Sequence, residues 1–284
     1  FCFIDFDDPN TFKGELTLEE IEKLTKNLGK SLLNVNLTGG EPFARKDIVD
    51  IAKLYIRNST VQSMYITTNA SLPDRVENFA NEITDFEKNI ELTFQISIDD
   101  LPEKHNKVRK IENLFENCVD TYFRLKKLKS NVNPVVSVTV THENCDDIEN
   151  IFNYLVHESK IDSLKCTIVR DEGVYKTPGE KREKIFSAYN WLTNKISELT
   201  KKGEIKNYNT KSLQGKLHNR KDKISWDLTK RMYLKPHYIS PCHAGGLFGI
   251  ITASGLVYPC EILEDKILGD LRKNNMDFMK IWKN

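Results

Sequence analysis

Apolar positions in the first two thirds of the chain alternate between helical spacing and short β-like runs. Thr17 followed three residues later by Glu20 forms a capping box, which opens an amphipathic stretch that extends to Leu28. The apolar run 32–38 follows and predicts a strand. Further helices are predicted at 47–56, 74–86, 108–128 and 146–157, and further strands at 61–67, 92–98, 135–141 and 164–169.

Strands that alternate with helices at this spacing imply parallel pairing with right-handed crossovers. The sequence therefore predicts an α/β fold, either an open sheet or a partial barrel. In both architectures ligands gather at the carboxyl ends of the strands.

The alternation of predicted helices and strands ends after Arg170. A long helix is predicted at 179–201, followed by a polar, basic stretch and then by a strand, an Ala-Ser-Gly turn and a strand that ends at Cys260. We expect a main domain at 1–205, a basic helical linker at 206–237 and a small module with a β-hairpin at 238–284.

Composition narrows the class of protein. The chain has 284 residues, with 42 lysines and arginines against 41 aspartates and glutamates, so no global field attracts it to nucleic acid or to a membrane. It shows no apolar window of membrane-spanning length and no signal-peptide pattern at its start, which predicts a cytoplasmic protein.

Six cysteines are too few and too scattered for a disulfide scaffold in a chain of this length. Reduced thiols are expected, some of them as metal or cluster ligands. Cys118, Cys145 and Cys166 are interpreted as structural, because they lie among apolar residues or beside a predicted helix.

The loop Gly39-Gly40-Glu41-Pro42 follows the strand predicted at 32–38. Two glycines let the backbone approach a ligand closely, Glu41 adds a negative charge and Pro42 stiffens the exit. Such a loop suits a small cationic ligand; the alternative is an ordinary turn between a strand and a helix.

This loop matches the GGEP motif of the radical S-adenosylmethionine (SAM) superfamily, which binds the methionyl ammonium of SAM. The family carries a [4Fe–4S] cluster on a CxxxCxxC loop, and Phe1-Cys2 resembles the end of that loop. The resemblance implies a partial (β/α)6 barrel, with Cys2 as a cluster ligand and with the other two cysteines before residue 1. It further implies that SAM is cleaved reductively to a 5′-deoxyadenosyl radical, with electrons from a donor such as flavodoxin or ferredoxin.

Two further strand ends resemble family segments. Thr67-Thr68-Asn69 is similar to a T-N-G sequence near SAM, with Ala70 in place of glycine. Ser97-Ile98-Asp99 is similar to an S-hydrophobic-D-G segment, with Asp100 in place of glycine, and 105–109 resembles the HDxxR stretch that follows it. The resemblance implies cofactor contacts for Phe1, the GGEP loop, Thr68, Asn69, Ser97, Asp99 and Arg170. For Arg170 the alternative is a solvated charge at a strand end.

The last module resembles the SPASM or twitch extension of radical SAM enzymes. This resemblance implies an auxiliary [4Fe–4S] cluster with Cys242 and Cys260 as two of its ligands. The alternatives are a β-hairpin with two incidental cysteines, or a zinc-binding module.

The substrate class stays open at this stage. Enzymes with this extension often modify peptides, and others act on small molecules. The basic residues between Lys211 and Lys235 allow an RNA-modifying alternative, although a solvated helix face is the more usual meaning of such a run. A non-catalytic binding domain that keeps GGEP is the third alternative.

Overall fold

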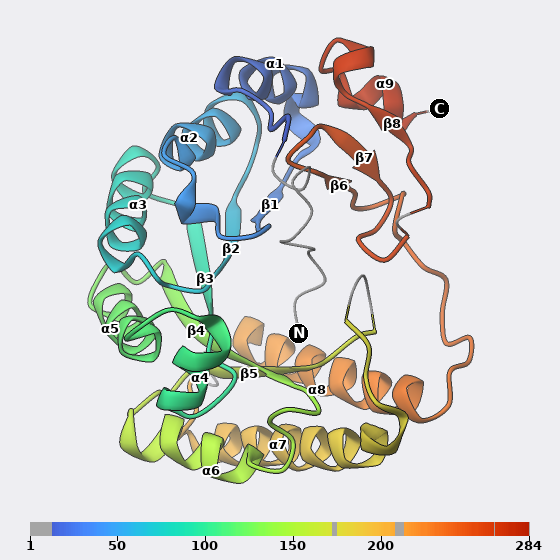
Figure 1. The fold of residues 1–284 in the computed structure, drawn as a ribbon. Coiled ribbons are helices and arrows are strands. Elements are labelled where there is room, and N and C mark those ends of the chain that lie inside the picture. The colour runs from blue at the N-terminus through green and yellow to red at the C-terminus, as the bar shows by residue number, and fades with distance from the viewer. Residues whose placement is uncertain (1–12, 172–174, 208–212, 264, 284) are drawn as a thin grey trace.

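The computed structural model describes residues 13–171, 175–207, 213–263 and 265–283. Five parallel strands form one curved sheet in the order β1-β2-β3-β4-β5, and helices cover its convex face (Figure 1). The strands are β1 (Asn34–Leu37), β2 (Ser63–Thr68), β3 (Glu91–Ser97), β4 (Val132–Val140) and β5 (Leu164–Ile168). The predicted α/β fold is confirmed, and its curvature is that of a partial barrel. The additional first strand of the expected (β/α)6 pattern would precede Cys2 and falls outside the described residues.

Five of the following six helices agree with the apolar spacing, and the last lies in the polar stretch that was expected only as a basic helical linker. They are α1 (Leu18–Leu28), α2 (Ile48–Asn58), α3 (Pro73–Phe86), α6 (Ile148–Asn153), α7 (Arg182–Lys202) and α8 (Leu213–Leu234), with a π-helical turn at Tyr154–Glu158. The capping box of α1 is confirmed. The Glu20 amide donates to Thr17 Oγ1 at 3.2 Å, and the Thr17 amide donates to Glu20 Oε2 at 2.9 Å.

The single helix predicted at 108–128 is wrong. The structure has two helices instead, α4 (Pro102–Arg109) and α5 (Leu114–Lys126). Lys110 and Asn113 between them adopt left-handed backbone conformations, with φ of 56° and 55°. The side chain of Asn106 stabilises the break, because its Oδ1 accepts a hydrogen bond from the Phe115 amide at 2.7 Å at the start of α5.

The two faces of the sheet differ in chemistry. On the convex face, Phe94 of β3 packs edge-on against Phe79 of α3, with ring centroids 6.1 Å apart, inside the main hydrophobic core. The alternate positions point to the opposite side, which we call the inner face. It comprises Asn34, Asn36, Ser63, Tyr65, Thr67, Glu91, Thr93, Gln95, Ser97, Asn133, Val135, Ser137, Thr139, Lys165 and Thr167.

The C-terminal module is a small antiparallel sheet of β6 (Ile250–Ile251), β7 (Leu256–Tyr258) and β8 (Gly269–Asp270), followed by α9 (Phe278–Trp282). The predicted hairpin is present, and β8 is a third strand that the sequence pattern did not indicate. The module lies beside α1 (Figure 1). A second hydrophobic core joins them, in which Leu24 and Leu28 of α1 pack with Val257, Leu271 and Ile281.

Arg272 also ties this module to α1. Its guanidinium donates to both carboxylate oxygens of Glu20, at 2.7 and 2.9 Å, and to the carbonyl oxygens of Gly14, Glu15 and Ser254. Arginine suits such a node, because its planar fork offers several donors in fixed directions.

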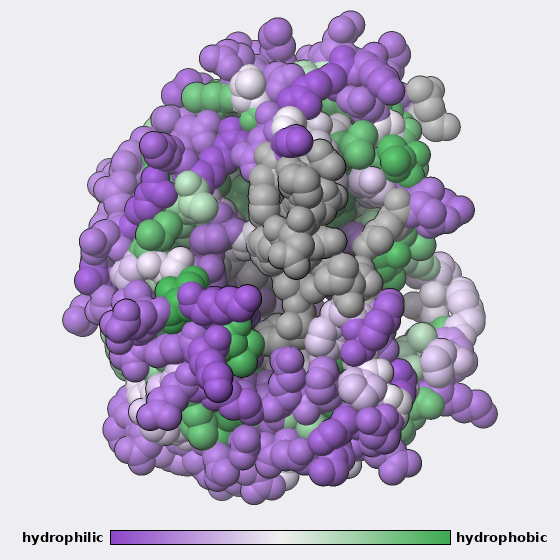
Figure 2. Space-filling view, in the orientation of Figure 1, coloured by the Kyte–Doolittle hydropathy of each residue, from purple (hydrophilic) through white to green (hydrophobic). Residues whose placement is uncertain are grey.

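The surface of the described chain is mixed in polarity. The helices of the main body are largely hydrophilic in the view of Figure 2, and apolar side chains gather near the C-terminal module. α8 packs along α7, and its Trp226 and Tyr233 contact the main core. None of the described helices combines the length and the apolar character that a membrane crossing requires.

Candidate functional site

The loop after β1 leaves its backbone open to ligands. Gly39 has φ of 134°, a conformation that favours glycine, and a Cβ atom added there would meet nothing within 4 Å. Gly39 and Gly40 are both exposed. The loop then enters a 3-10 turn at Pro42–Ala44, in which Pro42 and Phe43 are buried.

Glu41 links the carboxyl ends of β1 and β2. Its Oε1 accepts hydrogen bonds from the Thr68 hydroxyl at 2.8 Å and from the Phe43 amide at 3.1 Å, and its Oε2 accepts one from the Asn69 amide at 2.7 Å. Burial raises the pKa of Glu41 above its usual range, and these donors oppose the rise. The carboxylate therefore fixes the loop from inside and places a negative charge directly beneath the exposed glycine backbone.

The segment after β2 turns sharply at Ala70. This residue is fully buried and has φ of 53°, in the left-handed region where glycine is the usual choice. Its amide donates to Thr68 Oγ1 at 2.9 Å, and Asn69 Oδ1 accepts from the Ser71 amide at 2.9 Å. This backbone conformation gives a physical reason for the glycine of the T-N-G pattern that Ala70 replaces.

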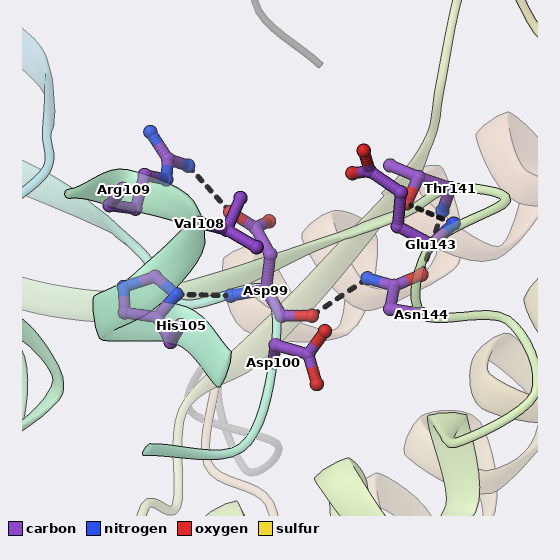
Figure 3. Close-up of a pocket in the computed structure, with 8 residues that line it drawn as sticks. All are labelled: Asp99, Asp100, His105, Val108, Arg109, Thr141, Glu143 and Asn144. Atoms are coloured by element: carbon purple, nitrogen blue, oxygen red, sulfur yellow. Dashed lines mark hydrogen bonds and ion pairs between the residues drawn. The ribbon is translucent and has the colours of Figure 1, made fainter. Parts of the chain in front are cut away.

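Asp99 lies two residues after β3, and its hydrogen bonds join α4, β4 and the loop that contains Asn144 (Figure 3). Its Oδ2 accepts from Arg109 Nη2 at 2.6 Å, and its Oδ1 accepts from the Thr139 amide of β4 at 2.8 Å. Its carbonyl oxygen accepts from Asn144 Nδ2 at 2.7 Å. Asp99 is only 4% exposed, and both carboxylate oxygens bond to the protein itself. In this structure Asp99 therefore positions the rim of the sheet.

His105 packs against this cluster from α4. Its Nδ1 lies 3.4 Å from the Asp99 amide, which donates to it, and burial lowers the pKa of His105 to about 4. The imidazole is thus neutral near pH 7. Among the described residues its buried Nε2 has no hydrogen-bond partner.

A small cavity adjoins this cluster, lined in part by Asp99, His105, Arg109 and Thr141 (Figure 3). Its volume is about 10 Å³, close to what one water molecule needs. The cavity is therefore too small for a nucleoside. The sequence argument did not single out Thr141 or Asn144. Asn144 donates to the Asp99 carbonyl and accepts from the Thr141 amide at 2.8 Å, and these contacts arise from the fold.

Ser97 is the last residue of β3, two positions before Asp99. It belongs to the inner face, where its register partner on β4 is Ser137, and the register partner of Ser137 on β5 is Lys165. Period-two alternation in 93–97 and in 133–139 was the sequence signal for these inward positions.

Arg170 connects the end of the sheet to the C-terminal module. Its Nη2 lies 2.7 Å from Glu261 Oε1, and the two side chains are 50% and 46% exposed. Glu261 directly follows Cys260, so this ion pair places the end of β5 beside the second cysteine of the module.

The two cysteine segments of the module lie side by side. A Cβ atom added at Gly245 would be 3.3 Å from Pro259 Cβ, which brings the loop after Cys242 against the residue before Cys260. Cys242 is exposed and Cys260 half-buried. Within the described ranges, no group of three or more Cys, His, Asp or Glu side chains is arranged to hold a metal ion. Phe1 and Cys2 lie outside the described residues.

The remaining cysteines are buried, as their structural interpretation requires. Cys118 is 0%, Cys166 3% and Cys145 7% exposed. Burial raises the pKa of all three thiols, which keeps them protonated. Cys118 Sγ donates to the Asn69 carbonyl at 3.2 Å and so supports the loop after β2 from below.

Comparison with known proteins identifies the family. The family model of the radical SAM superfamily matches residues 1–155, more than half of the chain. The chain belongs to the radical SAM superfamily. This membership makes it a relative of enzymes that use SAM, and the GGEP loop and the ends of β2 and β3 all lie within the matched range.

Two curated relatives are GTP 3′,8-cyclases. The chain is 28% identical to the protein of Cronobacter sakazakii over 146 residues, which cover 49% of this chain and 42% of that protein. It is 39% identical to the protein of Rhodopirellula baltica over 61 residues, which cover 21% of this chain and 17% of that protein. The match thus spans less than half the length of either radical SAM relative.

Solved structures of another radical SAM protein, anSMEcpe, share the fold. Its native form with bound AdoMet superposes with a TM-score of 0.62 at 16% identity, covering 94% of this chain and 71% of that one. The form with AdoMet and the Kp18Cys peptide gives a TM-score of 0.60 at 16% identity, covering 93% and 71%. At this identity the likeness concerns the architecture.

Proposed function

We propose that this chain binds SAM at the carboxyl ends of β1, β2 and β3 and, with a [4Fe–4S] cluster ligated in part by Cys2, is a radical SAM enzyme acting on a peptide or small-molecule substrate. The observation that carries the proposal is the bridge made by Glu41 between Phe43, Thr68 and Asn69 beneath two exposed glycines. When SAM is bound to a reduced cluster, its cleavage supplies a 5′-deoxyadenosyl radical that abstracts hydrogen from the substrate.

The described residues fit the methionyl end of SAM. The ammonium of SAM is a cation with several donors, and the exposed backbone of Gly39 and Gly40 offers carbonyl acceptors. The Glu41 charge beneath them stabilises a cation there. Asn69 and Ser97 would contact the rest of the cofactor, while Asp99 holds the rim that carries them.

The described residues supply part of the ligands that an iron–sulfur cluster needs. A [4Fe–4S] cluster takes three or four thiolates, and the described residues bring together two, Cys242 and Cys260. We assign these two cysteines to an auxiliary cluster of the SPASM or twitch type, whose other ligands would come from outside the described residues. Electrons would come from a flavodoxin- or ferredoxin-like donor.

The relatives leave two substrate classes open. The cyclases act on GTP, as their name states, and a solved form of anSMEcpe contains a peptide. For this chain both classes remain part of the proposal, and the Arg170–Glu261 ion pair supports a role for the C-terminal module beside the substrate.

The test is SAM binding and cleavage by the natural full-length protein. After anaerobic reconstitution, addition of dithionite and SAM should yield 5′-deoxyadenosine. Glu41→Ala should weaken SAM binding at least tenfold, whereas Glu149→Ala, which removes an exposed carboxylate of α6, should leave it unchanged. Absence of 5′-deoxyadenosine from a cluster-loaded sample would refute the proposed function.

A further inference from the structure

Asn144 joins the ends of β3 and β4 through a buried side-chain amide (Figure 3). It lies four residues after β4 and is 2% exposed. Its Nδ2 donates to the Asp99 carbonyl at 2.7 Å and to the Thr139 carbonyl at 2.8 Å, and its Oδ1 accepts from the Thr141 amide at 2.8 Å. Both polar atoms of the side chain are therefore bonded to backbone groups at the carboxyl rim of the sheet.

These contacts take the place of backbone pairing where the two strands separate. The Ile98 amide still donates to the Ser137 carbonyl at 3.1 Å, as in a regular parallel pair. Two residues further along β4, the Thr139 amide donates to Asp99 Oδ1 at 2.8 Å, and the Thr139 carbonyl accepts from Asn144 Nδ2. Two side chains thus hold the strand ends together at this level.

The backbone group that Asn144 holds adjoins the proposed SAM site. Asp99 lies two residues after Ser97, which ends β3 and which the proposed function places against SAM. The Asp99 amide donates to His105 Nδ1 at 3.4 Å, and the Asp99 carboxylate accepts from Arg109 at 2.6 Å. Its carbonyl is held by Asn144. Without Asn144, the peptide group after Asp99 would lose the contact that fixes its orientation.

Asn131 makes a comparable link at the opposite end of the same two strands. Its Nδ2 donates to the Ile90 carbonyl at 2.7 Å and to the Lys88 carbonyl at 3.3 Å. Since β3 begins at Glu91 and β4 at Val132, this amide joins their amino ends, away from the rim. The two asparagines therefore allow the position of such a link to be tested separately from its contribution to stability.

We propose that Asn144 is a positioning residue of the SAM site, which acts through Asp99 to hold the end of β3 in the conformation that binds SAM. The inference deepens the proposed function and rests on it, because it takes the ends of β1, β2 and β3 as the place of SAM. It assigns no contact between Asn144 and SAM, since the side chain is buried and bonded to the rim itself.

Asn144 could instead support only the fold of the sheet, and the two assignments predict different results. A role in the fold alone lowers stability and so the fraction of molecules that bind, but each folded molecule keeps its affinity for SAM. A positioning role weakens that affinity itself.

The experiment measures SAM binding by calorimetry on the natural full-length protein, loaded anaerobically with its cluster. Asn144→Asp keeps the shape of the side chain and the acceptor for Thr141 but removes the Nδ2 donors, and Asn144→Ser shortens the side chain without adding a charge. Both should raise Kd for SAM about tenfold, with the number of sites per loaded cluster unchanged. In turnover, KM for SAM should rise by a similar factor, while kcat for 5′-deoxyadenosine should change less than about threefold.

Asn131→Asp and Asn131→Ser are the matched controls, because they make the same changes at the amino ends of β3 and β4. They should leave Kd and KM for SAM unchanged, and urea unfolding should report the stability that each of the four variants loses.

Three results would overturn the inference. They are an unchanged SAM affinity in both Asn144 variants, an equal loss of affinity in the Asn131 variants, and failure of both Asn144 variants to fold, which would make Asn144 a residue of general stability. Failure of the unaltered, cluster-loaded protein to bind SAM would instead count against the proposed function.

Discussion

Asp99 and Arg109 form an ion pair at the rim of the sheet. Its removal should lower the free energy of unfolding. Asp99→Ala removes a carboxylate that is 5% exposed and leaves the Thr139 amide without its acceptor. An unsatisfied buried amide costs about 1–3 kcal/mol. Arg109 is 30% exposed and can regain water, which limits the additional loss to about 1 kcal/mol. We therefore expect a loss of about 2–4 kcal/mol in the free energy of unfolding.

The assay is urea unfolding of Asp99→Ala, Arg109→Met and the double variant. The free energy of unfolding of each is its midpoint urea concentration multiplied by the slope of that free energy against urea. The cycle should give a coupling energy of at least about 1 kcal/mol, because the pair is largely desolvated. Lys53 and Glu82 are the matched control, an ion pair at 2.7 Å whose side chains are 25% and 42% exposed. A coupling between Asp99 and Arg109 no larger than that of the control pair would refute the reasoning.

Two further predictions concern His105 and Arg272. Burial lowers the pKa of His105 from 6.5 to about 4, so its contribution to stability is complete above pH 6.5 and is lost as the pH falls towards 4, by up to about 3 kcal/mol. His105→Gln should flatten this part of the pH profile of the urea midpoint, while exposed His237→Gln should not; equal profiles for both would contradict the assignment. Arg272→Ala should speed amide hydrogen exchange in β8 and α9, because it removes the contacts with Glu20 and with the carbonyls of Gly14 and Ser254. Lys273→Ala, at an exposed neighbour, should leave exchange unchanged, and similar rates in both variants would exclude Arg272 as the tie.

Local patterns in the sequence were enough to predict the architecture. Helical spacing, the capping box at Thr17 and the short apolar runs all report on neighbouring residues. They placed the ends of β2 and β3 within one residue of Thr68 and Ser97. Parallel pairing then placed the GGEP loop at the same edge as those ends. This part of the candidate site is a consequence of topology.

Features that depend on distant contacts escaped the sequence argument. The break between α4 and α5 needs the Asn106 side chain to cap a helix nine residues away. Strand β8 is two residues long and exists through its pairing with β7. Arg272 meets Glu20 across 252 positions, and no local pattern marks such a pair. The inward position of Lys165 was readable in principle, since polar and apolar residues alternate along β5.

The second hydrophobic core has a consequence for how this protein can be divided. Leu24 and Leu28 on α1 are 1% and 7% exposed, and part of their cover comes from Val257, Leu271 and Ile281 more than two hundred residues later. A shortened chain that ended before the hairpin would expose the apolar side chains of α1 to solvent and would tend to aggregate. Exchange of the C-terminal module between related proteins, in evolution or in the laboratory, therefore requires that α1 be exchanged with it.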